Sequence, residues 1–173
     1  NRFAEIGNGG LVIVSDTSIR LLSADGSELW SANIQMSAPA LTSGGGRVAA
    51  YDVGGTELFV LDGSGVLLNQ TTEDPIVAAN LNGCGMLALT TEASGTKGHV
   101  EVYSAALQKL FDFNAHRRFV ADACVTEDGK YLAAVTMGQA DSVFVSNVVI
   151  YDLTQEDPIA EYSVQDGLVA AMR

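Results

Sequence analysis

Four consecutive segments of the chain repeat the same order of short apolar runs, and this repeat limits the possible folds more than any other feature. Each run is strand-sized and is cut by Gly, Asp, Asn or Ser, whereas amphipathic helical periodicity is nearly absent. Units of four strands that recur about every 40 residues are typical of β-propeller blades. We therefore predict an all-β propeller of four-stranded antiparallel blades. The predicted repeats span residues 3–35, 38–73, 75–115 and 119–166.

A fifth repeat begins near the C-terminal end but is not completed. The stretch "GLVAAM" at residues 167–172 resembles the first strand of a repeat, so we predict an extra strand over residues 168–172. We expect residues 1–173 to form a single propeller domain or part of a larger propeller. Because unpaired strand edges tend to pair, a homodimer through open blade edges, closing one eight-bladed ring, stays an alternative.

Asp-Gly steps occur at the same place in the first two repeats, in "LLSADGSELW" (residues 21–30) and "LFVLDGSGVLL" (residues 58–68). We predict tight turns there, between the third and fourth strands of a blade, because Asp and Gly tolerate the positive φ that such hairpins need. Trp30 follows on the outer strand, where we expect it to cover a neighbouring blade. The "GGG" at residues 44–46 lacks the Lys-Ser/Thr of a phosphate loop and predicts a hairpin turn.

The connection between the second and third strands grows along the chain, and it suggests a contact face. Insertions into one loop of a repeat usually lie on one face of the assembly. The enlarged loops, residues 92–99 and 138–147, are therefore our candidate partner surface, and the second exposes the apolar Val143 and Phe144. The basic "HRR" stretch, with Arg117 and Arg118, precedes the inner strand that holds Asp122, so these residues are predicted at one mouth of the channel.

The charge balance argues against two classes of partner. The 173 residues carry a formal net charge of −12, which repels phosphate backbones and anionic lipid surfaces. We therefore expect no nucleic-acid partner. Cys84 and Cys124 lie in apolar, strand-like contexts and are expected to be buried free thiols, although the sequence leaves a disulfide between them open.

Several stretches resemble known propeller families. The run "LSADGSELW" resembles the repeat of quinoprotein-like (PQQ-like) propellers, and "VTEDGKYLAAV" at residues 125–135 resembles a turn of WD-repeat propellers. The stretches "RVAAYDVGGTELFVLDGSG" and "PIVAANLNGCGMLALTTEASGTKGHVEVY" resemble an uncharacterised family of membrane-anchored propeller domains from Gram-positive clostridial bacteria. That resemblance implies an extracytoplasmic, cell-surface location and a membrane-anchored parent protein. It implies no particular activity.

The residues needed for propeller chemistry are largely missing. A quinone-dependent enzyme would need stacking aromatics and usually a vicinal Cys pair, and the chain has one Trp and two distant cysteines. A glycosidase would need two carboxylates in a central pocket, and Asp122 is the only acid within an inner strand. Four further acids, at strand ends and turns, are predicted to form turns. They are Asp52, Asp62, Asp128 and Asp152.

We therefore expect a non-catalytic binding or scaffold domain that contacts an unknown protein partner and holds no cofactor. No metal site is expected either, because His99 and His116 have no metal-ligand spacing. The alternative is a cell-surface sensor of a small ligand or a cell-wall polysaccharide, at the channel mouth beside Arg117, Arg118 and Asp122. A glycosidase or a quinoprotein-type enzyme is the least favoured hypothesis.

Overall fold

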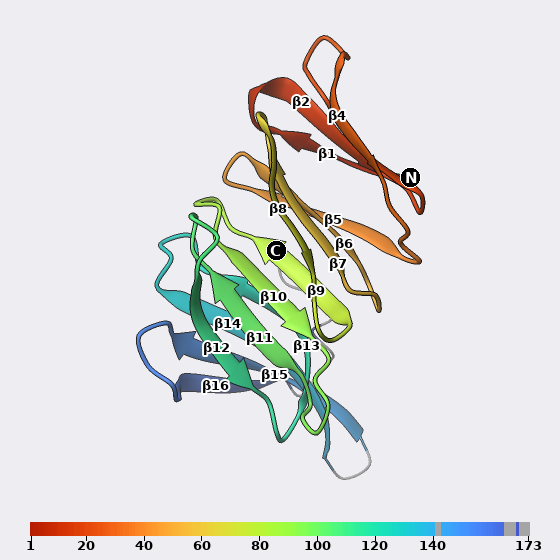
Figure 1. Ribbon diagram of the computed structural model, residues 1–173. Helices are drawn as coiled ribbons and strands as arrows, with labels where there is room; N and C mark the ends of the chain where they lie inside the picture. Colours follow the sequence, from red (N-terminus) through yellow and green to blue (C-terminus); the bar gives the residue numbers. More distant parts are fainter. Residues whose placement is uncertain (141–142, 165–168, 170–173) are drawn as a thin grey trace. The chain divides into compact units, whose positions relative to one another are not determined.

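The computed structural model describes residues 1–140, 143–164 and 169, and these residues form four four-stranded antiparallel sheets (Figure 1). Within each sheet the strands follow the chain order, so every connection is a hairpin between neighbours. The all-β fold class and the blade-like sheets predicted from the repeat are confirmed. The predicted strand over residues 168–172 falls, except for Val169, outside the described residues. No helix in the described part of the chain has the length and apolarity needed to cross a membrane.

The chain divides into two compact units, Asn1–Ile76 and Val77–Arg173. The first unit holds two sheets, with a short 3-10 helix, η1 (Gly7–Gly9), between its first two strands. The strands of its first sheet are β1 (Arg2–Ile6), β2 (Gly10–Val14), β3 (Ser18–Leu22) and β4 (Glu28–Asn33). The strands of its second sheet are β5 (Pro39–Gly44), β6 (Arg47–Asp52), β7 (Glu57–Asp62) and β8 (Gly65–Thr71).

The second unit holds the other two sheets, and its boundary falls at the first residue of β9. The strands of the third sheet are β9 (Ile76–Leu81), β10 (Leu87–Thr91), β11 (His99–Tyr103) and β12 (Lys109–Asn114). The strands of the fourth sheet are β13 (Phe119–Val125), β14 (Tyr131–Ala140), β15 (Val143–Asp152) and β16 (Pro158–Val164).

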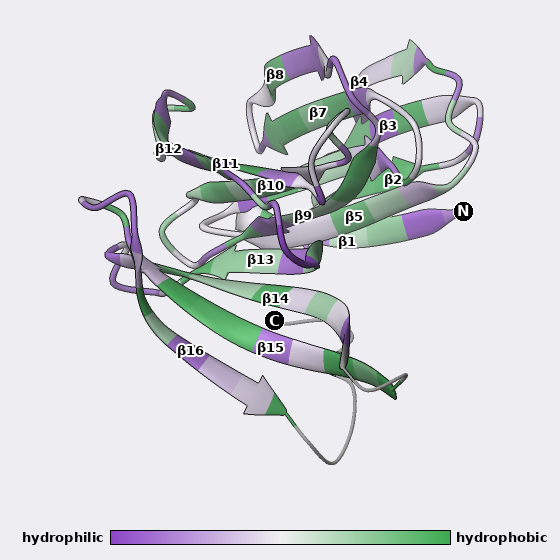
Figure 2. Ribbon diagram, turned by 90° about the horizontal axis from the view of Figure 1, so that it is seen from below, coloured by the Kyte–Doolittle hydropathy of each residue, from purple (hydrophilic) through white to green (hydrophobic). Residues whose placement is uncertain are grey.

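Each unit buries an apolar core between its two sheets. In the first unit, alternate residues of β2 and β3 pack against β6 and β7. Figure 2 shows that β7 is mostly hydrophobic. Trp30 of β4 packs against this core, with its ring centroid 6.4 Å from that of Phe59. The prediction that Trp30 covers a neighbouring blade is confirmed. In the second unit, Phe113 stacks on Tyr151 with 4.3 Å between ring centroids, next to the buried Leu132.

The Asp-Gly turn of the first sheet has one residue with positive φ rather than two. Gly26 has φ 86°, while Asp25 is not in the left-handed region. Asp25 instead accepts hydrogen bonds from the Ser23 hydroxyl (2.5 Å) and the Ser27 N–H (3.0 Å). These hydrogen bonds, of which the one from the Ser23 hydroxyl has the largest effect, lower the pKa of Asp25 from 3.8 to about 2. The strand register shifts by one residue beside this turn, between Leu21 and Leu22, which is typical of a hairpin with a glycine bulge.

The third sheet makes the same turn without glycine, and this pair of turns yields a stability prediction. Leu107 has φ 58°, and its N–H donates to Ser104 as the N–H of Gly26 donates to Ser23. A Cβ at Gly26 meets no atom within 4 Å, so Gly26→Ala adds only backbone strain. We expect Gly26→Ala to lower the free energy of unfolding by about 1 kcal/mol.

Leu107→Gly is the matched comparison, because it removes the same strain from the equivalent turn. We expect it to leave stability unchanged or higher, since relief of about 1–2 kcal/mol of strain offsets the loss of a half-buried side chain. Urea denaturation followed by circular dichroism checks both variants. Equal losses from the two substitutions would show that backbone strain does not set the stability of these turns.

The two cysteines differ in exposure. Both are free, and Cys124 is half-buried, where burial, followed by the charge of Asp122, raises the pKa of its thiol. Cys84 is exposed in the turn between β9 and β10, and its thiol donates to the carbonyl of Glu127 (3.1 Å). The prediction of two buried thiols is therefore wrong for Cys84, because Asn82 and Gly85 close a turn where the apolar pattern suggested a strand.

Candidate functional site

The predicted loop over residues 138–147 is instead the end of a long hairpin. β14 and β15 each have ten residues, and their pairing continues through Gly138–Val145, Gln139–Phe144 and Ala140–Val143. The corresponding strands of the first sheet, β2 and β3, have five residues each. The insertion therefore lengthened the strands rather than the loop, because its β-branched and aromatic residues suit a pleated surface. Figure 1 shows this hairpin reaching beyond the other strands of its sheet.

Two large apolar side chains lie at the end of this hairpin. Val143 is 62% exposed and Phe144 is 70% exposed. The strand register places Phe144 opposite Gln139, on the same face of the sheet as Met137 and its partner Phe119. Phe119 is itself 55% exposed. Phe119 of β13 and Phe144 of β15 therefore lie on the same face of this sheet.

The enlarged connection before β11 is attached to the same end of the unit. The Lys97 N–H donates to the carbonyl of Ala115 (2.6 Å), and the Val120 N–H donates to the carbonyl of Lys97 (3.0 Å). These hydrogen bonds hold residues 92–98 against the segment that leads into β13. The Lys97 ammonium lies 4.3 Å from the centroid of the Phe119 ring, a cation–π contact. The loop over residues 92–99 is therefore attached to the start of β13, where Phe119 pairs with Met137 of β14.

The basic stretch before β13 contributes one paired and one exposed arginine. Arg118 forms an ion pair with Glu161 of β16, and its side-chain stem lies against Gly138. The hydrogen bond from Arg118, the largest cause, holds the pKa of Glu161 below its usual value. Arg117 is exposed beside this pair. We call Lys97, Arg117, Phe119, Val143 and Phe144 the hairpin-end surface.

Asp122 is not part of this surface. It is 5% exposed, and its carboxylate accepts hydrogen bonds from the Asn80 side chain (2.6 Å) and from the Ala123 N–H (3.0 Å). Asn80 also donates to the carbonyl of Ala123 (2.9 Å), so this group ties β9 to β13. The structure thus gives Asp122 a position in the interior of the second unit, apart from Arg117 and Arg118.

The turn roles predicted for Asp62, Asp128 and Asp152 are confirmed, whereas the Asp52 side chain binds a segment 14 to 15 residues away. Asp62 accepts from the Ser64 N–H (2.7 Å), Asp128 from the Thr126 hydroxyl (2.6 Å) and Asp152 from the Thr154 N–H (2.9 Å). Asp52 accepts from the Ser37 and Ala38 N–H groups. Among residues 1–140, 143–164 and 169, no three His, Cys, Asp or Glu side chains are grouped as metal ligands.

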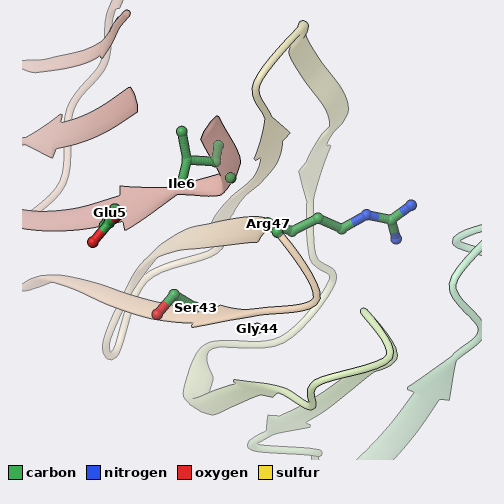
Figure 3. Close-up of a pocket in the computed structure, with 7 residues that line it drawn as sticks. Glu5, Ile6, Ser43, Gly44 and Arg47 are labelled. Carbon is green, nitrogen blue, oxygen red and sulfur yellow. The ribbon is translucent and has the colours of Figure 1, made fainter. Parts of the chain in front are cut away.

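A shallow hollow in the first unit does not assemble reactive groups. It has a volume of about 320 Å³ and is lined by residues of β1, η1 and the β5–β6 hairpin, including Glu5, Ser43 and Arg47 (Figure 3). In Figure 3 the Arg47 side chain extends away from Glu5 and Ser43. The "GGG" stretch forms the hairpin turn here, as predicted, with φ 59° at Gly45 and 74° at Gly46.

These four sheets define a WD40-like β-propeller fold, and solved structures share it. The Pan2 WD40 domain of Neurospora crassa aligns with a TM-score of 0.60 and 17% identity over 98% of this chain and 53% of its own. The Cps50 (Swd1) β-propeller domain of Myceliophteria thermophila aligns with a TM-score of 0.68 and 11% identity over 98% and 56%. Hsv2p of Kluyveromyces lactis aligns with a TM-score of 0.60 and 14% identity over 90% and 50%.

The chain spans about half the length of these propellers. It belongs to the family described as "Family of unknown function (DUF5711)", whose model matches residues 1–171. No curated protein matches the chain. The likeness to solved structures is below 20% identity in each case and therefore concerns the fold.

Proposed function

We propose that this chain is a non-catalytic propeller domain that binds a protein partner through the hairpin-end surface. The observation that carries the proposal is the exposure of Val143 (62%) and Phe144 (70%) on a hairpin extended well beyond the lengths of β2 and β3. An extension that served only the stability of its own sheet would bury its large apolar side chains. Exposed aromatic side chains instead favour a partner interface, where such residues supply much of the binding energy.

The neighbouring segments support a rigid contact surface. Backbone hydrogen bonds hold Lys97 against Ala115 and Val120, and the Arg118–Glu161 ion pair joins β16 to the start of β13. A surface that is already ordered loses little conformational entropy when a partner binds. The extracytoplasmic location implied by the family resemblance stays a prediction, and so does the alternative of a sensor for a small ligand or polysaccharide.

Selection of a random displayed peptide library on the immobilised chain tests the proposal. We expect enriched peptides to lose their binding on the double variant Val143→Thr/Phe144→Thr, because Thr suits a strand but removes the apolar contacts. The matched control is Phe3→Thr/Leu29→Thr, which removes two apolar side chains of the first sheet that are 75% and 54% exposed. Enrichment that survives in the hairpin variant, or that never exceeds the background, would refute the proposed surface.

A further inference from the structure

The hairpin-end surface is locally basic, although the chain as a whole is acidic. The chain has only 9 Lys and Arg residues and a net charge of −12. Three of those residues, Lys97, Arg117 and Arg118, gather where the β10–β11 connection meets the start of β13. This local positive charge, set against a negative background, points to a partner segment with negative charge.

Two of the three cations remain available for a partner. Arg118 already pairs with Glu161. Within the described residues, no carboxylate oxygen lies within 4 Å of the Lys97 ammonium or the Arg117 guanidinium, and both side chains are exposed. Asp141 of the hairpin tip falls outside the described residues. Carboxylates from a partner can thus reach both Lys97 and Arg117. The guanidinium of Arg117 suits bidentate pairing with a carboxylate.

The same surface also provides apolar contact area. The Lys97 ammonium lies over the ring of Phe119, and Phe119 is 55% exposed. The strand register places Phe144 on the same face of the sheet as Phe119. Val143 is also exposed at the hairpin end, but as the neighbour of Phe144 in β15 it lies on the opposite face of the sheet. Cations beside exposed aromatic rings suit a ligand that carries carboxylates and apolar side chains in one short segment.

We propose that the hairpin-end surface binds a short acidic peptide segment with interspersed apolar side chains, presented by the partner protein. This inference rests on the proposed function and specifies the chemistry of its partner. At physiological ionic strength, charges are screened beyond about 8 Å, so the local cations act on a short segment while the rest of the chain contributes little. A long polyanion would extend over the acidic remainder of the chain and be repelled.

Three peptide libraries displayed on the same scaffold test the inference. Alternate positions are restricted to Asp/Glu in the first library, to Asn/Gln in the second and to Lys/Arg in the third, and the other positions are random. On the unmodified chain we expect the acidic library to be enriched about tenfold over the other two. We expect this preference to disappear in Lys97→Gln/Arg117→Gln, and to weaken as salt is raised.

The matched control is Arg2→Gln/Lys130→Gln, which removes two exposed cations that are not among the residues of the hairpin-end surface and changes the net charge equally. It should keep the acidic preference, and urea denaturation should show that both double variants remain folded. A second arm adds poly-glutamate as a competitor, which we expect to displace the selected peptides at least tenfold less well than an unlabelled selected peptide.

The outcomes separate the inference from the proposed function. Equal enrichment of the amide library, lost on Val143→Thr/Phe144→Thr, would overturn the acidic partner while leaving the contact surface in place. Preference for the basic library would overturn the inference, because it would show that the net negative charge of the whole chain, rather than the local cations, selects the peptide. Equal competition by poly-glutamate would overturn the apolar part of the segment. Peptide binding that is unchanged in the Val143→Thr/Phe144→Thr variant would refute the proposed function itself.

Discussion

Replacing Asp52 with Ala is expected to lower the free energy of unfolding by about 3 kcal/mol. The Asp52 side chain is 5% exposed at the end of β6, and its two oxygens accept the N–H groups of Ser37 (3.0 Å) and Ala38 (2.6 Å). These N–H groups belong to the connection that joins the first sheet to the second. Ser37 and Ala38 are themselves exposed, but without the carboxylate their N–H groups lose two hydrogen bonds to a charged acceptor, each worth about 1.5–3 kcal/mol.

Two further variants show whether these hydrogen bonds are the cause. Asp52→Asn keeps one carbonyl oxygen of nearly the same shape, so we expect about half the loss. Asp62→Ala removes a carboxylate that serves a surface turn through Ser64, and its loss should stay near 1 kcal/mol. Urea denaturation curves followed by circular dichroism give the three values. Asp52→Ala and Asp62→Ala with equal losses would contradict this assignment.

Leu132→Ala is the second substitution for which we expect a large effect, again about 3 kcal/mol. Leu132 of β14 is fully buried in the core of the second unit, opposite Val125 and Tyr151 in the two neighbouring strands. Alanine removes most of the buried side chain and leaves a cavity that the paired strands cannot close. The same denaturation measurement reports the loss.

The control for this substitution is Leu110→Ala in β12, where the leucine is 55% exposed. We expect a loss below about 0.5 kcal/mol there, because the side chain is largely in water already. A similar loss at both positions would mean that β propensity, rather than burial, sets the cost of removing leucine from these strands.

The fold was predictable because its information is local. A two-residue alternation of apolar side chains and turn residues at regular intervals appear directly in the sequence, and together they specify hairpins of neighbouring strands. The four predicted repeats agree with the four observed sheets. The prediction failed where one local pattern suits two structures. At Cys84 an apolar context led into a turn, and at residues 138–147 a stretch that begins with glycine and polar residues continued as paired strands, which its β-branched and aromatic residues suit.

The candidate site was only partly predictable. Val143, Phe144, Arg117 and Arg118 stood out by residue type, because apolar tips and basic clusters are unusual in an acidic chain. Lys97 and Phe119 were missed as a pair, although both lay in or beside segments already singled out. Nothing in the sequence shows that the β10–β11 connection folds onto the start of β13.

By itself, therefore, the sequence determined the strand order, the antiparallel hairpins and the acidic character of the chain, because each depends on neighbouring residues or on composition alone. The tertiary structure decided which side chains meet. It buried Asp122 against Asn80, paired Arg118 with Glu161 and placed Lys97 on Phe119. These partners lie 22 to 43 residues apart, and only the packing of one sheet on the next, or of a fourth strand beside its sheet, brings such distant residues into contact.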